Sequence, residues 1–182
     1  MNKTYFSSDL HFMHDKPFLY EPRGFKSIYE MNEQLIKNFN EVMDWSDDLY
    51  ILGDCFLCNN DEGIKLMKRL PGTKHIIFGN HDSDVRKELM REAGFECLGL
   101  ASIIKLNGLR FYLCHYPTMT ANFDLDKPLK ARVLSLSGHT HSSEVWDAAG
   151  GYNVALDAHN NYPVEITEII EAFKNKCNIP KS

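Results

Sequence analysis

The sequence has no long apolar run. No stretch of its 182 residues approaches the roughly 20 consecutive apolar residues that a helix needs to span a bilayer. Its first residues, Met1-Asn2-Lys3-Thr4-Tyr5, lack the charged and apolar regions of a signal peptide and lead directly into an expected strand. We therefore expect a soluble protein of the cytoplasm that makes no contact with a membrane.

Cysteine is scarce and unevenly spaced. The chain has five cysteines, an odd number at irregular spacing, which is typical of reduced thiols in a cytosol: Cys55, Cys58, Cys97, Cys114 and Cys177. Cys55-Phe56-Leu57-Cys58 has the C-x-x-C spacing of a redox pair or of half a zinc site. The sequence has no second such pair, and this one follows Asp54 instead of opening a thioredoxin-type helix. We interpret both cysteines as free thiols in a loop.

Positive charge is in deficit. The chain has 20 Lys and Arg against 25 Asp and Glu, which gives a net charge of −5 and a pI near 5.9. Proteins that coat nucleic acid usually present a basic face, so a nucleic-acid substrate is possible but not favoured. Internal repeats, low-complexity tracts and Gly/Ser-rich linkers are also missing. We expect residues 1–182 to form one domain with its own core.

Strands and helices are expected to alternate in the first half of the chain. Short apolar strands are predicted at 4–8, 49–52 and 75–78. Between and after them, helical spacing and capping residues predict three helices: from Ser27 to about Met43, from Asn60 or Asp61 to Leu70, and from Ser83 or Asp84 to Gly94. This alternation is the pattern of a parallel α/β sheet.

The second half has a different pattern. Asn107-Gly108 separates two apolar runs, Ser102–Leu106 and Leu109–Cys114, and predicts a β-hairpin. Further strands are expected at 133–137 and 152–156, followed by a last helix capped by Thr167. A parallel first half and a meandering second half predict an α/β fold in which two sheets pack face to face with helices outside.

Five short motifs carry side chains that bind metals. Most of them follow a predicted strand, where α/β proteins assemble their sites: Asp9-Leu10-His11, Gly53-Asp54, Gly79-Asn80-His81-Asp82, His115, and Gly138-His139-Thr140-His141. Together they offer seven ligands, enough for two divalent metals: Asp9, His11, Asp54, Asn80, His115, His139 and His141. The mixed nitrogen and oxygen donors favour Mn²⁺, Fe, Zn²⁺ or Co²⁺ over Ca²⁺. His81 remains for proton transfer.

Asp54 and the glycines have expected roles in this arrangement. A carboxylate has two oxygens, so Asp54 is the natural ligand to bridge two cations. Two metals roughly 3.5–4 Å apart can generate a hydroxide at neutral pH and bind the attacking and leaving oxygens of a phosphoryl transfer. Gly53, Gly79 and Gly138 each precede a ligand, where a side chain would crowd the metals or forbid a positive φ.

The series of motifs resembles that of the calcineurin-like metallophosphoesterases, with no member missing from residue 9 to residue 141. The chain looks most similar to small bacterial and phage members without a cap domain, whose Ser-Asp-x-His-Phe-x-His run and Arg-x-Phe appear here at 8–14 and 23–25. The resemblance implies a four-layer α/β/β/α sandwich of two mixed sheets flanked by helices. It also implies that Asp9, His11, Asp54 and His141 hold one metal and that Asp54, Asn80, His115 and His139 hold the other.

By the same resemblance the protein is a hydrolase of phosphate esters, preferably a small diester, that uses metal-held hydroxide and His81 as the general acid. We expect two divalent transition metals, Mn first, with Fe, Zn, Co or Ni as alternatives. The sequence leaves open a phosphomonoesterase or nucleotidase, an end-acting nuclease, and a scaffold that binds without catalysis. His14 and Arg23 are candidates for substrate contact. The oligomeric state and the roles of His14, Arg23, His159 and the Cys55/Cys58 pair are left open.

Overall fold

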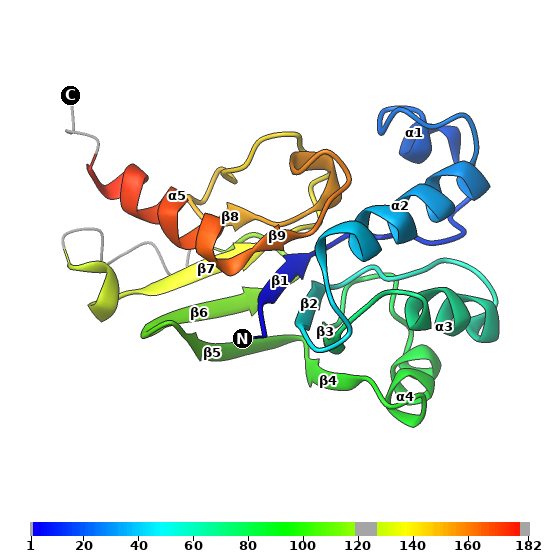
Figure 1. Cartoon of the computed structure of the whole chain (residues 1–182), viewed down its shortest axis with the longest axis horizontal. Helices are drawn as coiled ribbons and strands as arrows, with labels where there is room; N and C mark the ends of the chain where they lie inside the picture. Colours follow the sequence, from blue (N-terminus) through cyan, green and yellow to red (C-terminus); the bar gives the residue numbers. More distant parts are fainter. Residues whose placement is uncertain (1, 119–126, 179–182) are drawn as a thin grey trace.

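The computed structural model describes residues 2–118 and 127–178, which form two mixed β-sheets with helices on either side (Figure 1). The first sheet has the order β4-β3-β2-β1-β9, in which the first four strands are parallel and β9 runs antiparallel to β1. Its strands are β1 (Thr4–Ser7), β2 (Asp48–Leu52), β3 (Thr73–Ile77), β4 (Glu96–Gly99) and β9 (Val164–Glu165). The parallel first half is therefore as predicted.

The second sheet has the order β5-β6-β7-β8. Its strands are β5 (Ala101–Leu106), β6 (Leu109–Cys114), β7 (Val133–Ser137) and β8 (Tyr152–Asn153). The predicted hairpin joins β5 to β6, and both of its turn residues, Asn107 and Gly108, have positive φ angles. The remaining pairs, β6 with β7 and β7 with β8, are parallel. Both sheets are thus mixed, which confirms the predicted fold class.

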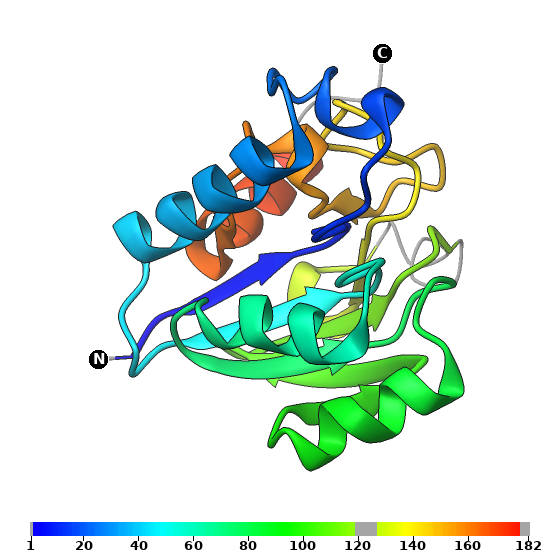
Figure 2. The same ribbon diagram turned by 90° about the vertical axis from the view of Figure 1, so that its right-hand side faces the viewer.

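Helices cover the first sheet on two sides (Figures 1 and 2). Three of them gather on one face, and their apolar residues share a core with that face of the sheet: α2 (Ile28–Val42), α3 (Asn60–Lys68) and α4 (Asp84–Glu92). On the other face, Phe6 and Leu52 pack with Phe111 and Leu136 of the second sheet. The C-terminal helix α5 (Ile166–Asn178) adds its apolar residues to this second core and contacts β1 and β9. Side chains along β1 point alternately to the two faces of the sheet, so Tyr5 packs in the core beneath the three helices and Phe6 in the core between the sheets.

The helix ends follow the capping residues closely. Ser27 accepts a hydrogen bond from the Glu30 N–H at the start of α2, as predicted. Ser83 likewise caps α4, and Gly94, with a φ of +88°, follows the C-cap residue of that helix. The cap of α3 is one residue earlier than predicted, because the Asn59 side chain accepts from the Asp61 N–H.

Three predictions of local structure were wrong or incomplete. The strand expected at 152–156 ends at Asn153, whose side chain accepts from the Ala155 N–H and turns the chain into a short 3-10 helix, Leu156–Ala158. Thr167 does not cap α5 but lies inside it, where its hydroxyl donates to Glu165. The short elements β4, β9 and α1 (Pro17–Tyr20) were not predicted.

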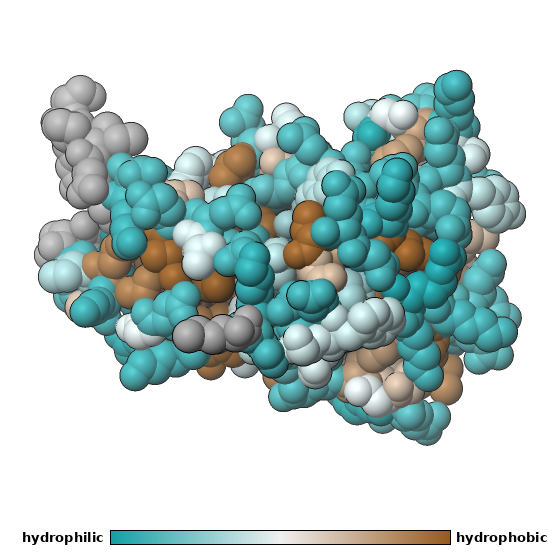
Figure 3. Space-filling model, viewed as in Figure 1, coloured by the Kyte–Doolittle hydropathy of each residue, from teal (hydrophilic) through white to brown (hydrophobic). Residues whose placement is uncertain are grey.

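The described cysteines Cys55, Cys58, Cys97 and Cys114 are all free thiols, as interpreted from the sequence; the structure does not describe the Cys177 side chain. Cys55 is fully buried in the core beneath the three helices. Within the described residues no helix combines the length and apolar character that crossing a bilayer requires. The face seen in Figure 3 is mostly hydrophilic, with apolar atoms gathered in smaller patches.

Candidate metal centre

The five motifs meet at one place because the loops after the strands are joined through their backbones. The loop after β1 runs alongside the loop after β2: the Asp9 N–H donates to Gly53 O (3.1 Å) and the His11 N–H to Asp54 O (3.0 Å). The loops after β6 and β7 are joined by a bond from the Gly138 N–H to His115 O (3.0 Å). These bonds fix the relative positions of the side chains that the loops carry.

Most of the candidate ligands have a left-handed backbone. The φ angles are positive at five of the seven, namely Asp9 (58°), His11 (48°), Asp54 (54°), His139 (71°) and His141 (48°). Non-glycine residues in this region cost of order 1–3 kcal/mol each and persist where surrounding contacts enforce them, commonly at functional sites. The segment from Asp9 to His11 is therefore sharply bent.

Asp54 lies at the centre of the cluster. Its Oδ2 is 3.6 Å from His11 Nε2, 3.5 Å from His115 Nε2 and 3.8 Å from His81 Nε2. Burial acts to raise the pKa of Asp54, but the contact with His115 and the backbone N–H of His81 outweigh it and bring the pKa to about 2. Asp54 is therefore an anion surrounded by imidazole nitrogens.

Asp9, His11 and His141 form one group of donors. His11 Nε2 and His141 Nε2 face each other at 3.1 Å, and Asp9 Oδ1 lies 3.7 and 3.6 Å from them. This carboxylate oxygen is fully buried and has no hydrogen-bond partner among the described residues. Burying a polar atom without a partner costs free energy. A divalent cation between the three atoms would satisfy all of them, so these residues fit a metal.

His115, Asn80 and His139 form a second group, which meets Asp54 through His115. His115 Nδ1 lies 2.7 Å from Leu52 O; since a carbonyl only accepts, this nitrogen carries the proton. The other ring nitrogen, Nε2, lies 3.0 Å from Asn80 Oδ1 and 3.1 Å from His139 Nδ1. Burial acts to lower the pKa of His115, but the contact with Asp54 outweighs it and raises the pKa. A backbone carbonyl that fixes the tautomer of an imidazole in this way is typical of metal ligands.

Comparison with known proteins agrees with this geometry. Residues 3–155 match the calcineurin-like phosphoesterase superfamily domain, which is most of the chain. The chain belongs to this superfamily. It is 30% identical over 184 residues to an uncharacterised protein of Methanocaldococcus jannaschii, covering 96% of this chain and 93% of that protein. A solved structure of a protein of unknown function from Aquifex aeolicus is 27% identical, with a TM-score of 0.74 and coverage of 94% and 100%.

A third relative is named for an activity. The chain is 28% identical over 131 residues to a UDP-2,3-diacylglucosamine hydrolase of Histophilus somni, covering 65% of this chain and 51% of that enzyme. Membership of the superfamily makes this protein a hydrolase of phosphate esters, with a cluster of residues suited to metal binding.

In this phosphoesterase Arg23 is placed differently from the prediction that it contacts phosphate. Its side chain is 1% exposed and forms a two-pronged pair with Asp157 (2.7 and 3.0 Å). One of its nitrogens also donates to the backbone oxygen of Asp9 (2.8 Å). Arg23 therefore supports the Asp9 loop, and it lines a cavity of about 400 Å³ together with His141 and Asp157 while its charge is paired with Asp157.

Asp157 is a residue of the site that sequence reasoning missed. Its Oδ2 lies 3.2 Å from His141 Nδ1, so it orients the ring whose Nε2 faces His11. The only signal in the sequence was its place in a polar segment, Asp157-Ala158-His159, that follows an expected strand. Asp82, a member of the third motif to which the sequence assigned no role, accepts from the backbone N–H of Gly79 (2.8 Å) and of Asp54 (3.2 Å), which ties two of the motif loops together.

Replacing Asp157 by Asn should destabilise the metal-free protein in a pH-dependent way. Burial alone would raise the pKa of Asp157, but His141 and Arg23 hold it well below its ordinary value. A lowered pKa contributes stability that is complete above the unfolded value near 3.8 and is lost as the pH falls below it. We expect a loss of about 3 kcal/mol at neutral pH, the effect of leaving a buried Arg23 without its partner.

Urea unfolding of wild type and variant without metal, at neutral pH and at about pH 3, measures this effect. The difference in the free energy of unfolding should shrink at the lower pH. Asp48→Asn, which alters an aspartate in β2 that is 40% exposed, serves as the control and should show a smaller difference. A difference for Asp157→Asn that is the same at both pH values would contradict the lowered pKa.

His81 and His14 stand at the opening of the cluster. The His81 side chain is 40% exposed, and its backbone N–H donates to Asp54 Oδ1 (3.0 Å). His14 Nδ1 is 3.3 Å from His11 Nδ1, so it contacts the back of a candidate ligand as well as the cleft. Burial, with the charges of His11 and His81, lowers the pKa of His14 to about 4, which leaves its ring neutral at physiological pH.

The glycines that precede the ligands are required by space as well as by backbone angle. A Cβ on Gly53 would lie 2.6 Å from His115 Nδ1 and 2.7 Å from Gly79 Cα, and its φ is +92°. A Cβ on Gly79 would collide with Asp54, and one on Gly138 with Ser8 and Asp9. A side chain at any of the three positions would therefore collide with neighbouring residues of the site, and the positive φ is found at Gly53.

Replacing Gly53 by Ala should lower the stability of the protein by about 3 kcal/mol, the sum of left-handed strain and overpacking. Gly94→Ala is a matched control, because Gly94 has a similar φ of +88° but open space around its Cα. We expect it to lose only about 1–2 kcal/mol, from strain alone. Denaturant unfolding of both variants gives the comparison, and equal losses would show that the contact with His115 is relieved at little cost.

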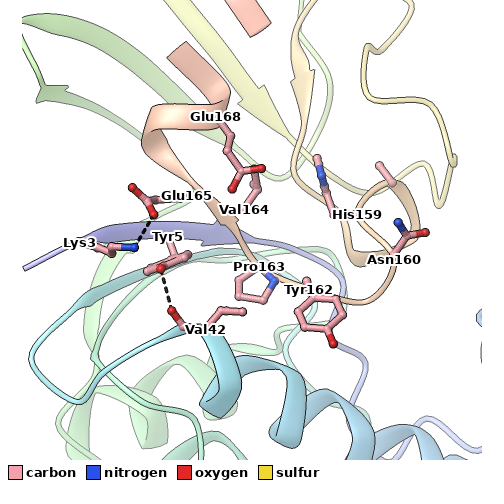
Figure 4. Close-up of a pocket in the computed structure, with 11 residues that line it drawn as sticks. Lys3, Tyr5, Val42, His159, Asn160, Tyr162, Pro163, Val164, Glu165 and Glu168 are labelled. Carbon is pink, nitrogen blue, oxygen red and sulfur yellow. Dashed lines mark hydrogen bonds and ion pairs between the residues drawn. The ribbon is translucent and has the colours of Figure 1, made fainter. Parts of the chain in front are cut away.

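His159 does not join the donor groups. It lines a separate cavity of about 620 Å³ together with Tyr5, Tyr162 and Glu168, and none of the candidate ligands lines it (Figure 4). The charges at this cavity are partly neutralised, because Lys3 pairs with Glu165 at 2.9 Å. The His159 ring bonds to the Asn153 carbonyl (2.7 Å), so its contacts are structural.

Proposed function

We propose that this protein hydrolyses phosphodiesters with the help of two divalent metals. Asp9, His11, Asp54 and His141 would hold one metal, and Asp54, Asn80, His115 and His139 the other. The observation that carries the proposal is two pairs of close imidazole nitrogens, His11 with His141 and His115 with His139, both at 3.1 Å, with His11 and His115 each within 3.6 Å of Asp54 Oδ2. Facing nitrogens beside a buried carboxylate are the arrangement expected of cation ligands.

The metals would polarise the phosphoryl oxygens and lower the pKa of a water. Manganese is the first candidate, and Fe, Zn, Co and Ni share the same donor chemistry. The protein's own contribution is to present the donors at fixed positions. The Asp54 charge offsets the repulsion between two cations, and Asp157 and Leu52 O fix the ring orientations of His141 and His115.

His81 is the residue proposed to protonate the leaving oxygen. Its ring is at the opening of the cluster, 3.8 Å from Asp54, and is partly exposed, so that it can reach a bound ester and exchange protons with solvent. The hydrogen bond from the His81 backbone N–H to Asp54 Oδ1 fixes the position of the His81 backbone, from which the imidazole ring extends. Asp82 does not hold this ring, because its hydrogen bonds go to the backbone of Gly79 and Asp54.

Diesters are favoured over monoesters by the openness of the site. His81 and His141 are both about one-third exposed or more, so that ester groups on phosphorus have room to extend. The relative named UDP-2,3-diacylglucosamine hydrolase supports the same preference, since the phosphates of a UDP-linked sugar carry an organic substituent on each side. A phosphomonoester carries one more negatively charged oxygen than a diester. Arg23 is not free to neutralise that charge, because its guanidinium is paired with Asp157.

The test is hydrolysis by metal-stripped protein of bis-p-nitrophenyl phosphate and of p-nitrophenyl phosphate, with Mn²⁺ added and then with EDTA. We expect that Mn²⁺ restores cleavage of the diester, that EDTA abolishes it, and that the monoester is cleaved more slowly. Faster cleavage of the monoester would replace the diester proposal by a phosphomonoesterase. Stoichiometric metal binding without hydrolysis of either compound would favour a binding scaffold.

A further inference from the structure

A small apolar cavity lies directly beside the candidate metal centre. Its volume is about 200 Å³, and Phe18, Leu19, Pro22, His141 and Asp157 line it. The two neighbouring residues of α1 differ sharply in exposure: Leu19 is 5% exposed and packs into the core, whereas Phe18 is 72% exposed. A large apolar side chain left in water beside a candidate site is a feature that ligand binding would explain.

A row of rings leads from the candidate acid to this cavity. The His14 ring lies between those of His81 and Phe18, with centroid distances of 6.0 and 5.9 Å, and it meets the Phe18 ring edge-on. His141, whose Nε2 belongs to the first donor group, also lines the cavity. A phosphate bound at the donor groups would thus have an ester substituent within reach of Phe18.

The lining of the cavity excludes a charged occupant. Asp157 is its only acidic residue, and that carboxylate is already paired with Arg23 and His141. The other lining side chains are apolar except His141. A second phosphate or a carboxylate would meet no free cation here, whereas a flat uncharged ring could stack on Phe18 as bases stack on aromatic side chains.

We propose that Phe18 and this cavity form a subsite for an uncharged planar ring, aromatic or heterocyclic, carried by one ester group of the substrate. This inference rests on the proposed function and deepens it. It assigns the substrate class as phosphodiesters that have an aryl group or a nucleobase close to phosphorus, and it makes Phe18 a residue that determines specificity.

Binding of two stable analogues tests the subsite apart from catalysis. Methyl phenylphosphonate and methyl cyclohexylphosphonate carry the same charge and rings of similar size, but only the phenyl ring is flat. Calorimetric titration of the manganese-loaded protein should give a preference of about tenfold for the phenyl compound. Phe18→Ala should abolish the preference, and Tyr29→Ala, a change of an equally exposed ring on α2, should retain it. Metal content should be unchanged in both variants.

The outcomes separate the subsite from the proposed function. Hydrolysis of diesters with equal binding of both analogues, or a preference that survives Phe18→Ala, overturns the subsite and leaves the function intact. A phenyl preference that depends on Phe18, in a protein that hydrolyses no phosphate ester, supports the subsite and overturns the function. A preference lost equally in Tyr29→Ala shows a general surface effect and overturns the subsite.

Discussion

Asp54→Asn is expected to reduce kcat/KM for diester hydrolysis by about 10³-fold or more, equivalent to roughly 4 kcal/mol of lost transition-state stabilisation. Asp54 is the carboxylate that both donor groups share, and its Oδ2 lies within 3.8 Å of His11, His115 and His81. An amide has the same shape but no negative charge to offset two cations. We therefore also expect the variant to retain fewer metal ions per chain, measured by elemental analysis after dialysis.

The substitution is designed to keep the fold. Asn retains an oxygen at the Oδ1 position, which accepts the hydrogen bond from the His81 N–H. Asp48→Asn is the matched control in the same strand, β2, because Asp48 pairs with His75 away from the donor groups. It should retain full activity and metal content. If the Asp54→Asn protein binds two metals and keeps its activity, Asp54 is not the ligand that the two metals share.

His81→Ala is expected to lower kcat by about 10²- to 10⁴-fold for a diester with an alkyl leaving group, with metal content unchanged. The reason is that an alkoxide departs readily only when it is protonated, and His81 is the partly exposed imidazole at the opening of the cluster. A p-nitrophenolate ion departs without a proton, so the loss should be much smaller for a p-nitrophenyl ester. The measurement is kcat for a series of leaving groups of decreasing acidity.

This dependence on the leaving group separates a general acid from a positioning residue. If His81 only positions the substrate, the loss will be the same across the series. His159→Gln provides the control, because His159 lines the separate cavity shown in Figure 4 and should leave the whole series unaffected. A lower metal content in His81→Ala would show that His81 is a metal ligand and not the general acid.

The long elements of the fold could be predicted because local signals and packing agree in them. Strands β1, β2 and β3 are apolar runs that are buried in the finished sheet, and Ser27 and Ser83 cap their helices directly. The Asn107-Gly108 turn has the positive φ angles that its residues favour. In these places the preferred conformation of a few residues coincides with what the tertiary structure needs.

Short elements escaped prediction because their existence depends on distant partners. Strand β9 has only two residues, and it is a strand because Val164 and Glu165 pair with β1 across most of the chain length. The end of β8 is decided by the Asn153 side chain, which bonds to the Ala155 N–H instead of extending the ladder. No window of sequence around these residues contains that information.

For the candidate site, too, some features follow from the sequence and others from the tertiary structure. The sequence by itself determined which donor atoms are available, in which order, and on the ends of which strands: carboxylates, an amide and imidazoles in five motifs, with glycines where a Cβ would collide with Asp54 or His115. These are properties of side chains, and they do not depend on what lies opposite.

Only the tertiary structure decided which nitrogens face each other, that the backbone at the ligands is left-handed, and that the charge of Arg23 is paired with Asp157. Arg23 and Asp157 are 134 residues apart in the chain. Their pairing is a matter of burial, because a guanidinium removed from water needs an anion beside it, and which anion is near is set by how the loops pack.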